Sequence, residues 1–346
     1  MQPLTGDEAG SSDDPRARDV LVLGSAQLRS LLTLDVVVPA VEAAYVASSR
    51  GEATVYPVVR ETLPGGMGVF GIKSGYWPGQ DALGLKVAGY WPGNRARGID
   101  NHQATVLLVD PPTGTARAVL DGNVITYIRT AAAGAIGARR LARPDARRAV
   151  VVGTGVQGEA QARALAWWKP ELEIVAFEPL DEPDRQRALG FAERLRRDGI
   201  DCRAAVSLQA AVAEADVVVT ATPSSQPLVA RAWLRPGTHL NAMGADTRGK
   251  QEHDVATLRD ARVVVDDWRQ ARELGECQHG VAAGLFGDAP PATIGAVIAG
   301  EAAGRQTPDE LTLFDATGIA LQDLAAAALA YRLAREHGLG TRISLE

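Results

Sequence analysis

Three glycines in the middle of the chain stand at a spacing that binds phosphate groups. Gly153, Gly155 and Gly158 form G-x-G-x-x-G within VVVGTGVQGEAQ (150–161), after a short apolar run and before a helical pattern. The first glycine allows a tight turn, the second lets the backbone approach a pyrophosphate, and the third lets helix and strand pack closely. The helix N-terminus then supplies N–H groups and a positive dipole end. The pattern predicts a dinucleotide site that brings hydride to a substrate.

The next strand-like segment bears on which dinucleotide is bound. EIVAFE ends in Glu178, about 20 residues after the third glycine, where a carboxylate accepts hydrogen bonds from a ribose hydroxyl and repels a 2′-phosphate. This favours NAD, as NADH, over NADP. A solvated strand end is the alternative, and the nearby Arg185 and Arg187 leave NADP open.

Cationic side chains precede the glycine loop and could hold an anion. Arg60 closes VYPVVR, Lys86 lies within LGLKVAG, and Arg129 opens an Ala-rich segment. An arginine or lysine at a strand end is usually solvated, but Lys86 interrupts an apolar strand, where an unpaired ammonium is costly to bury. The net charge is −6, so an anionic partner has to be held by a few placed cations. A small anionic substrate is therefore expected.

Composition excludes several other partners. With 36 Lys+Arg against 42 Asp+Glu and no basic run, no nucleic acid is expected to bind. No apolar run reaches the ~18 residues of a membrane span, and the acidic, polar start of the chain lacks the order of a signal peptide. We therefore expect no membrane contact and a cytoplasmic location.

Cysteine and histidine give little indication of a metal or thiol site. Cys202 and Cys277 are too few and too far apart for a disulfide framework or a zinc site. The single Cys-x-His formed by Cys277 and His279 is more typical of packing. No metal is expected.

The elements that must position these groups fall into two kinds. A helical pattern covers 33–50, with Pro39 as a possible interruption. Short β-like runs separated by Gly, Pro and Asn follow, and predict an antiparallel region: they are 55–60, 68–77, 83–91, 104–110 and, after the turn DPPTG, TARAVLDG.

From about residue 125 the pattern changes. An Ala-rich helix ends before Pro144, and the apolar strands AVVVG, EIVAFE, DVVVTAT, THLNAMG and RVVVDD then alternate with helical segments. Such strands predict a parallel sheet covered on both faces, and hence an α/β fold. The segment 314–338 is interpreted as a final long helix with its preceding turn.

Several motifs together resemble the ornithine cyclodeaminase/mu-crystallin family: VVGTGVQGEAQ, NAMGADTRGKQE (241–252), IRTAAAGAIGARRLAR and FDATGIALQDLAAAAL. The resemblance runs in order over nearly the whole chain. It implies a flexible tail at 1–18 and a Rossmann NAD-binding domain at 128–313. An α+β substrate-binding and dimerisation domain would comprise 19–127 and the C-terminal helix, 314–346. It also implies a homodimer through the N-terminal domain, which explains the late position of the glycine loop.

The resemblance also implies a reaction. GYWPGN (89–94), DNHQATVLLVDPPTG (100–114) and LGECQHGVAAGL (274–285) are similar to family members that reduce iminosuccinate to L-aspartate with NADH. The expected function is NAD(H)-dependent reduction of a small 2-imino acid to the L-amino acid. The alternatives are ornithine or lysine cyclodeamination, reduction of a cyclic ketimine such as pyrroline- or piperideine-2-carboxylate, and a mu-crystallin-like ligand-binding role.

The resemblance assigns roles to the cations. Arg60, Lys86 and Arg129 match positions that hold the substrate carboxylate, by guanidinium forks and a point charge. Lys73, in FGIKSGY, matches a lysine of the iminosuccinate-type sequence and is expected to bind a second carboxylate; a solvent-facing side chain is the alternative. His102 and Gln103 could bind the distal end of the substrate or serve structure.

Imine reduction needs a proton at nitrogen, and the candidates to supply it are Lys86, Asp246 and Asp315. Asp246 follows LNAMGA at the carboxyl end of a strand, where it could instead cap a turn. Asp315, in FDATG, could orient the amine or cap the last helix. The residues expected to contact the cofactor are Gly153, Gly155, Val156, Gln157, Gly158, Glu178, Thr222, Met243, Asp246, Thr317 and Gly318.

Overall fold

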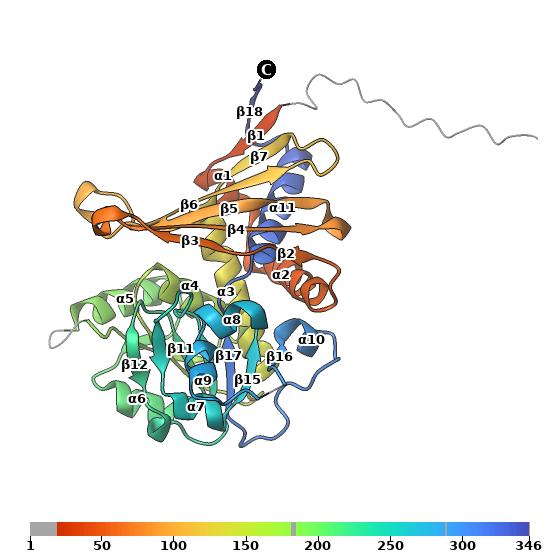
Figure 1. The fold of residues 1–346 in the computed structure, drawn as a ribbon. Coiled ribbons are helices and arrows are strands. Elements are labelled where there is room, and N and C mark those ends of the chain that lie inside the picture. Colours follow the sequence, from red (N-terminus) through yellow and green to blue (C-terminus); the bar gives the residue numbers. More distant parts are fainter. Residues whose placement is uncertain (1–18, 181–184, 288, 346) are drawn as a thin grey trace, which may run out of the picture.

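The computed structural model describes residues 19–180, 185–287 and 289–345. The tail expected at 1–18 lies outside the described residues. The described chain builds two large sheets, one above the other in Figure 1. The upper sheet is mixed and mainly antiparallel, and the lower sheet is parallel.

The mixed sheet has the strand order β18-β1-β7-β6-β5-β4-β2, with β3 paired to β4. Its strands are β1 (Val20–Leu23), β2 (Thr54–Val55), β3 (Val59–Thr62), β4 (Val69–Trp77), β5 (Ala82–Tyr90), β6 (His102–Val109), β7 (Ala116–Asp121) and β18 (Thr341–Ile343). Lys73 of β4 lies directly opposite Lys86 of β5 in the ladder. Because paired residues share a face, the two ammonium groups enter the same side of the sheet.

Four helices cover that side of the mixed sheet: α1 (Ser25–Leu31), α2 (Leu34–Ser49), α3 (Gly122–Leu141) and α11 (Ala320–Glu336). The helix α2 continues through Pro39, so the interruption considered there does not occur. The helix α3 packs on β6 and α11 at one end and on α4, β13 and β17 of the parallel sheet at the other. It therefore joins the two halves.

The parallel sheet has the order β10-β9-β8-β11-β13-β17-β15-β16, and confirms the expected α/β class. Its strands are β8 (Arg148–Val152), β9 (Glu173–Phe177), β10 (Cys202–Ala204), β11 (Val217–Thr220), β13 (His239–Ala242), β15 (Arg262–Val265), β16 (Ala292–Thr293) and β17 (Thr312–Asp315). A small parallel pair, β12 (Ser225–Val229) and β14 (Gln251–His253), lies beside it.

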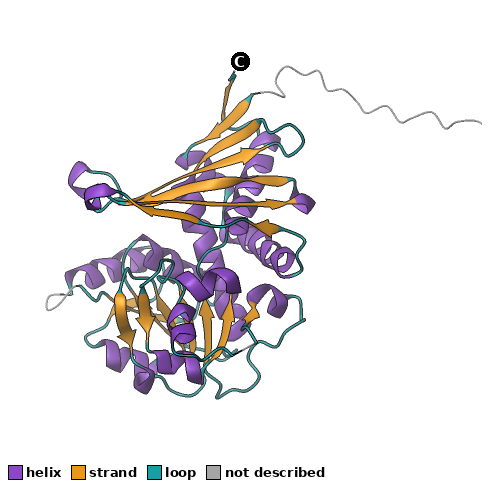
Figure 2. Ribbon diagram, in the orientation of Figure 1, coloured by secondary structure: helices purple, strands orange, loops and turns teal. Residues whose placement is uncertain are grey.

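Helices flank both faces of the parallel sheet (Figure 2): α4 (Val156–Trp168), α5 (Gln186–Arg197), α6 (Leu208–Glu214), α7 (Val255–Asp260), α8 (Trp268–Leu274), α9 (Cys277–Ala282) and α10 (Ile294–Ile298). Val150 and Val152 enter one core cluster while Ala149 and Val151 enter another. Each strand is thus buried on both sides, which is why its sequence is continuously apolar.

The C-terminal segment differs from the interpretation of 314–338 as a helix with its preceding turn. Thr312–Asp315 is a central strand, β17, paired with β13 and β15, and the helix starts at Ala320. The boundary expected at residue 314 therefore falls inside a strand of the parallel sheet. The four residues of β17 are fully buried. A short buried run of this length is more typical of a strand than of a helix.

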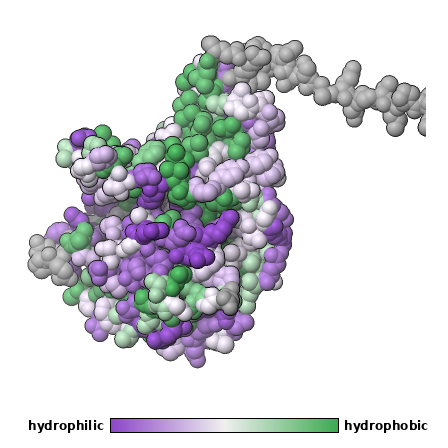
Figure 3. Space-filling model, in the orientation of Figure 1, coloured by the Kyte–Doolittle hydropathy of each residue, from purple (hydrophilic) through white to green (hydrophobic). Residues whose placement is uncertain are grey.

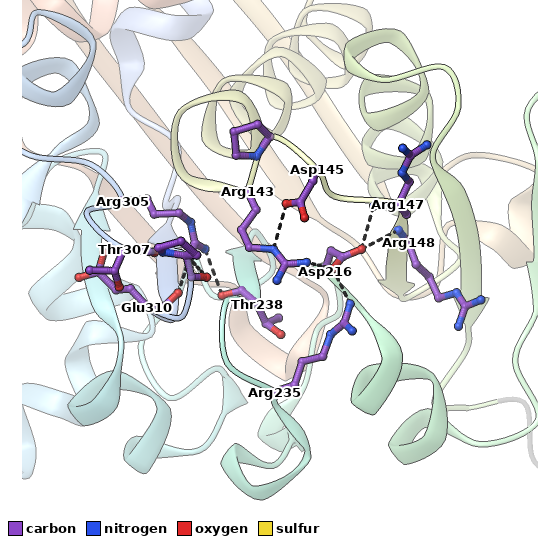
Figure 4. A network of polar contacts seen from close by, with 12 residues as sticks. Arg143, Asp145, Arg147, Arg148, Asp216, Arg235, Thr238, Arg305, Thr307 and Glu310 are labelled. Carbon is purple, nitrogen blue, oxygen red and sulfur yellow. Dashed lines mark hydrogen bonds and ion pairs between the residues drawn. The ribbon is translucent and has the colours of Figure 1, made fainter.

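A polar network ties the amino ends of the parallel strands together (Figure 4). The buried carboxylate of Asp216 accepts hydrogen bonds from Arg143 Nη2 at 2.7 Å, from Arg235 Nη2, and from the backbone N–H of Arg147 at 2.7 Å. Arg305 donates to the carbonyls of Leu141 and Glu310. The network lies at the sheet edge away from the carboxyl ends, and so serves structure.

Within the described ranges no single helix is long and apolar enough to cross a membrane, although α1 and α2, bent by 86° at their break, pass that test as a pair.

Candidate active site

A cavity of about 150 Å³ lies between the mixed sheet and the carboxyl ends of the parallel strands. Its size suits a small metabolite, since sites for drug-sized ligands are several times larger. The structure brings nine of the expected residues to its wall: Arg60, Lys73, Lys86, His102, Arg129, Gln157, Met243, Asp246 and Thr317. Cations of the front half therefore meet four of the expected cofactor residues of the back half here.

Lys86 and Arg129 share one buried carboxylate. Lys86 Nζ and Arg129 Nε donate to the same Asp323 oxygen, Oδ1, at 2.8 and 2.9 Å, and Lys86 Nζ also donates to Thr126 Oγ1 at 3.2 Å. Burial and the charge of Arg129 lower the pKa of Lys86 to about 7, although Asp323 opposes this. Burial acts to raise the pKa of Asp323, but Arg129 and Lys86 outweigh it and hold that pKa below its usual value.

Lys73 lies against the turn between β17 and α11. Its Nζ donates to the carbonyl oxygens of Thr317 at 2.9 Å and Gly318 at 2.6 Å. Burial lowers the pKa of Lys73 to about 8, against the attraction of Asp246. Lys73 therefore does not point to solvent, and an ammonium with three donors has one left for a ligand.

Arg60 and Asp246 form an ion pair across the cavity. Arg60 Nη2 lies 3.6 Å from Asp246 Oδ2, and Lys250 Nζ lies 2.7 Å from Asp246 Oδ1. Burial acts to raise the pKa of Asp246, but Lys250, Arg60 and Lys73 outweigh it and hold that pKa well below its usual range. Asp246 is thus a carboxylate at neutral pH and is a poor proton donor.

His102 and Gln103 differ in their placement. His102 lines the cavity, and its Nδ1 lies 3.1 Å from Asn123 Oδ1. Burial and the charge of Lys86 lower the pKa of His102, which favours a neutral ring. Gln103 does not line the cavity; its Nε2 donates to the Asp100 carbonyl at 2.8 Å. Gln103, in β6, thus contacts the loop before its own strand.

The glycine loop joins β8 to α4. Gly153 has φ of +100°, and a Cβ there would lie 2.6 Å from the Ala221 carbonyl, while the space over Gly155 is open. Val156 and Gln157 begin α4, and Gln157 Oε1 is buried without a partner. Glu178, after β9, accepts hydrogen bonds from Thr154 N at 3.0 Å and Thr154 Oγ1 at 2.8 Å. Open space over exposed N–H groups beside a carboxylate fits a dinucleotide.

Thr222 is fixed by hydrogen bonds to Glu252. Its N–H and its hydroxyl both donate to Glu252 Oε1 at 2.7 Å, which fixes the loop after β11 beside the glycine loop. Met243 follows β13 and lines the cavity. Together they shape the carboxyl edge of the sheet.

Asp315 is not brought to the cavity. It ends β17, is fully buried, and its Oδ2 accepts a hydrogen bond from Cys277 N at 2.9 Å, while Oδ1 has no partner. It does not cap α11, whose N-cap is Ile319. Burial raises the pKa of Asp315 to about 7. Asp315 does not line the cavity, so the structure gives no support to the proton-donor role considered for it.

Three further residues near the cavity were not predicted from the sequence. Asp323 and Gln270 lie on the buried faces of α11 and α8, and Asp266 follows β15. Asp323 could have been found from the sequence, since it is a carboxylate inside an apolar helix. Burying such a group requires a cationic partner.

Neither cysteine takes part in a metal site. Among the described residues, no group of three or more His, Cys, Asp or Glu side chains is placed to hold a metal ion. Cys277 is buried, and burial raises the pKa of its thiol. His279 Nε2 lies 2.8 Å from the Lys250 carbonyl, and Cys277 belongs to the core of the parallel sheet. Both residues therefore serve packing.

Comparison with known proteins extends this description. The ornithine cyclodeaminase/mu-crystallin family model matches residues 18–338. The iminosuccinate reductase of Paracoccus denitrificans is 38% identical, over 94% of this chain and all of that protein. Its crystal structure in complex with NAD⁺ matches with a TM-score of 0.86 and 37% identity, over 95% of this chain and 100% of the other.

Two further structures agree in fold. An archaeal alanine dehydrogenase dimer with bound NAD has a TM-score of 0.87 and 35% identity, covering 95% of this chain and 100% of the other. The Δ1-pyrroline-2-carboxylate reductase of Thermococcus litoralis, in complex with NADH and L-proline, has a TM-score of 0.86 and 30% identity, covering 94% and 100%. All three relatives carry a nicotinamide dinucleotide.

Proposed function

Because the chain belongs to the ornithine cyclodeaminase/mu-crystallin family, we propose that it reduces a small 2-imino acid to the L-amino acid with NADH. Iminosuccinate, which would give L-aspartate, is the substrate that we infer. The observation that carries the proposal is the wall of the cavity, where four cationic side chains, Arg60, Lys73, Lys86 and Arg129, meet one carboxylate, Asp246.

The cofactor would be held by the glycine loop and its neighbours. Gly153, Gly155 and Gly158 would admit the pyrophosphate at the N-terminus of α4, and Glu178 would accept from the adenosine ribose. Thr222, Met243 and the Thr317–Gly318 turn would flank the nicotinamide end. The bound cofactor supplies the hydride that reduces C=N.

The excess of positive charge favours a dicarboxylic substrate. Arg129 would bind the carboxylate next to the imine, while Lys73 and Arg60 would bind the distal one. Fixing both ends orients the imine carbon before reaction and lowers the entropic part of the barrier. In this small, partly dry site the cations also stabilise charge that develops during reduction.

Lys86 is the residue that we assign to proton delivery. Two of its three N–H donors contact Thr126 and Asp323, which leaves one for the cavity. A pKa near 7 lets an ammonium give up a proton at neutral pH. Asp246, which stays ionised, would instead orient Arg60 and Lys250.

One experiment separates this function from its rivals. Purified protein is mixed with NADH and with oxaloacetate, pyruvate or glyoxylate, each with ammonia, and separately with cyclic imines. The expected result is NADH oxidation, with oxaloacetate and ammonia giving the highest kcat/KM. Ammonia release from ornithine or lysine without net NADH consumption would indicate a cyclodeaminase. Cofactor and ligand binding without turnover on any imine would indicate a binding protein.

We also propose that the chain is a homodimer through the mixed sheet. Gly84 faces α11, since a Cβ there would lie 3.1 Å from Leu324 Cδ2, so Leu83 and Leu85 point to the other side. Figure 3 shows hydrophobic residues, in green, gathered over the mixed sheet. An apolar sheet face of this kind requires a cover, and the archaeal relative is a dimer.

A further inference from the structure

The turn Thr317–Gly318, between β17 and α11, is held from both halves of the molecule. From the mixed sheet, Lys73 donates to its two carbonyl oxygens. From the parallel sheet side, the buried Asp266 and Gln270 contact the same two residues. Gly318 has φ of +77°, and a Cβ there would lie 2.7 Å from Arg129 Nη1. The backbone of the turn is thus packed against two of the cations that line the cavity.

Asp266 controls the orientation of one peptide group. Its Oδ2 accepts the Gly318 N–H at 2.6 Å, and its Oδ1 accepts the Thr317 hydroxyl at 2.8 Å. The N–H of Gly318 and the carbonyl of Thr317 belong to one planar trans peptide, so they point in opposite directions. Holding the N–H on Asp266 therefore aims the carbonyl at Lys73 Nζ. A carboxylate that accepts from the N–H also polarises the peptide group. This strengthens the hydrogen bond that the Thr317 carbonyl oxygen accepts from Lys73.

Gln270 fixes the second carbonyl. Its Nε2 donates to Thr317 Oγ1 at 2.7 Å and to Gly318 O at 3.1 Å. Lys73 Nζ donates to that same Gly318 oxygen at 2.6 Å. The Thr317 hydroxyl donates its only proton to Asp266 and accepts from Gln270, so it serves the turn rather than proton transfer.

We propose that Asp266 and Gln270 are positioning residues for the imino-acid reaction, which fix the Thr317–Gly318 turn so that its carbonyls hold the Lys73 ammonium at the cavity wall. The inference rests on the proposed function and adds two residues to it that touch neither substrate nor cofactor. Burial raises the pKa of Asp266, and the hydrogen bonds from the turn and the charge of Lys73 oppose that rise.

The test is a double-mutant cycle on the imino-acid KM. D266N and Q270A are made in the wild-type chain and in K73M, with D267N as the matched control. Asp267 is the adjacent carboxylate, and it caps α8 through Gln270 N without contacting the turn. D266N and Q270A are expected to raise KM roughly tenfold, the weight of one hydrogen bond to a charged group, with a smaller change in kcat. In K73M the same substitutions are expected to change KM less than about twofold, because the group they position is gone.

A second measurement does not depend on turnover. Hydrogen exchange of residues 316–320, followed by mass spectrometry, is expected to accelerate in D266N and Q270A and to stay unchanged in D267N. Equal KM effects in the wild-type and K73M backgrounds, or unchanged exchange at the turn, would overturn the positioning role. Absence of turnover by the wild-type chain on every imine would instead overturn the proposed function, while exchange would still report on the turn.

Discussion

Lys86 and Asp323 lie 237 residues apart in the chain and form a buried ion pair, with Nζ and Oδ1 separated by 2.8 Å. The same oxygen accepts from Arg129 Nε at 2.9 Å. One carboxylate of α11 therefore sets the position of two cations, from β5 and α3, that face the substrate cavity. In the proposed function, substrate binding and the packing of the last helix therefore depend on the same contacts.

Asp323→Asn tests this dependence. Asp323 raises the pKa of Lys86 against burial and Arg129, so its loss lowers that pKa below about 7. Fewer Lys86 side chains then carry charge at neutral pH. The expected result is a lower kcat/KM at pH 7, with the alkaline limb of its pH profile moved to lower pH.

The same substitution is expected to destabilise the fold. Removing one partner of a buried ion pair leaves uncompensated charge and costs about 3 kcal/mol, which urea unfolding measures. Glu336→Gln, on an exposed position of the same helix, is the control and should change neither quantity. An unchanged pH profile in D323N would show that Lys86 does not titrate in the reaction.

Lys73→Met tests the second carboxylate. Lys73 Nζ has one donor left beyond the Thr317 and Gly318 carbonyls. The expected KM rise for a dicarboxylic imino acid is about tenfold or more, the weight of a charge-assisted hydrogen bond, and much smaller for a monocarboxylic one. Lys169→Met, which removes a lysine that also donates to a backbone carbonyl but lies far from the cavity, is the control. Equal losses on both substrates would contradict the assignment.

Much of the fold followed from periodicity. The parallel strands are apolar without alternation, and the turns between the antiparallel strands contain Gly and Pro, so a parallel sheet and an antiparallel region were predicted. The short strands β1 and β18 were not predicted, and β1 pairs in parallel with β7, so the front sheet is mixed. The strand β17 was missed because its four residues run directly into a turn and a long helix. A short apolar run does not distinguish strand from helix by itself, and only its neighbours β13 and β15 decide it.

A site residue could be predicted from the sequence where its type is energetically unfavourable in its local setting. Lys86 in an apolar strand indicated a function, and the glycine spacing indicated a turn. Asp266 and Gln270 lie in segments that look like any strand end and short helix, and their role arises from contacts with a turn about 50 residues away. Spacing along the chain does not contain that information. Asp315 was selected by its motif, and the structure buries it instead.

Asp315→Asn is expected to change stability rather than catalysis. Burial raises the pKa of Asp315 to about 7, above the value of about 3.9 for an unfolded chain. The folded state therefore binds the proton more tightly, and its stability falls as the pH rises from about 4 through 7. The asparagine variant lacks this penalty.

Urea unfolding of D315N and the wild-type chain between pH 5 and 9 measures the effect. The variant should gain a few kcal/mol relative to wild type at pH 8, since a tenfold change in an acid constant corresponds to about 1.4 kcal/mol. At pH 5, about one unit above the unfolded value, it should gain less, about 1.5 kcal/mol, and kcat should change little at either pH. A large loss of kcat with unchanged stability would restore the catalytic interpretation of Asp315.

Glu178→Gln tests the choice between NADH and NADPH. The amide keeps an acceptor for Thr154 N and Thr154 Oγ1 but loses the charge that repels a 2′-phosphate. The ratio of kcat/KM for NADPH to that for NADH should rise by about tenfold, mostly through the KM for NADPH. Glu173→Gln, at the start of the same strand, should leave the ratio unchanged. If both variants give the same ratio, Glu178 does not distinguish the ribose of NADH from that of NADPH.

Leu107→Glu tests the dimer. Leu85 and Leu107 are paired across β5 and β6, and Leu107 is paired with Val119 of β7, so the three side chains form a row on the face away from α11. A glutamate in the middle of that row would bury a charge without a partner in a dimer but would stay solvated in a monomer. Light scattering after size exclusion should therefore give the dimer mass for wild type and the monomer mass for L107E.

Thr105→Glu, on the same strand and face but already exposed, is the control for added charge and should remain a dimer. Leu85, Leu107 and Val119 are not among the residues that line the cavity, so L107E is expected to bind NADH. A wild-type chain that runs as a monomer at every concentration would contradict the proposed interface, and the apolar row would then need a different cover.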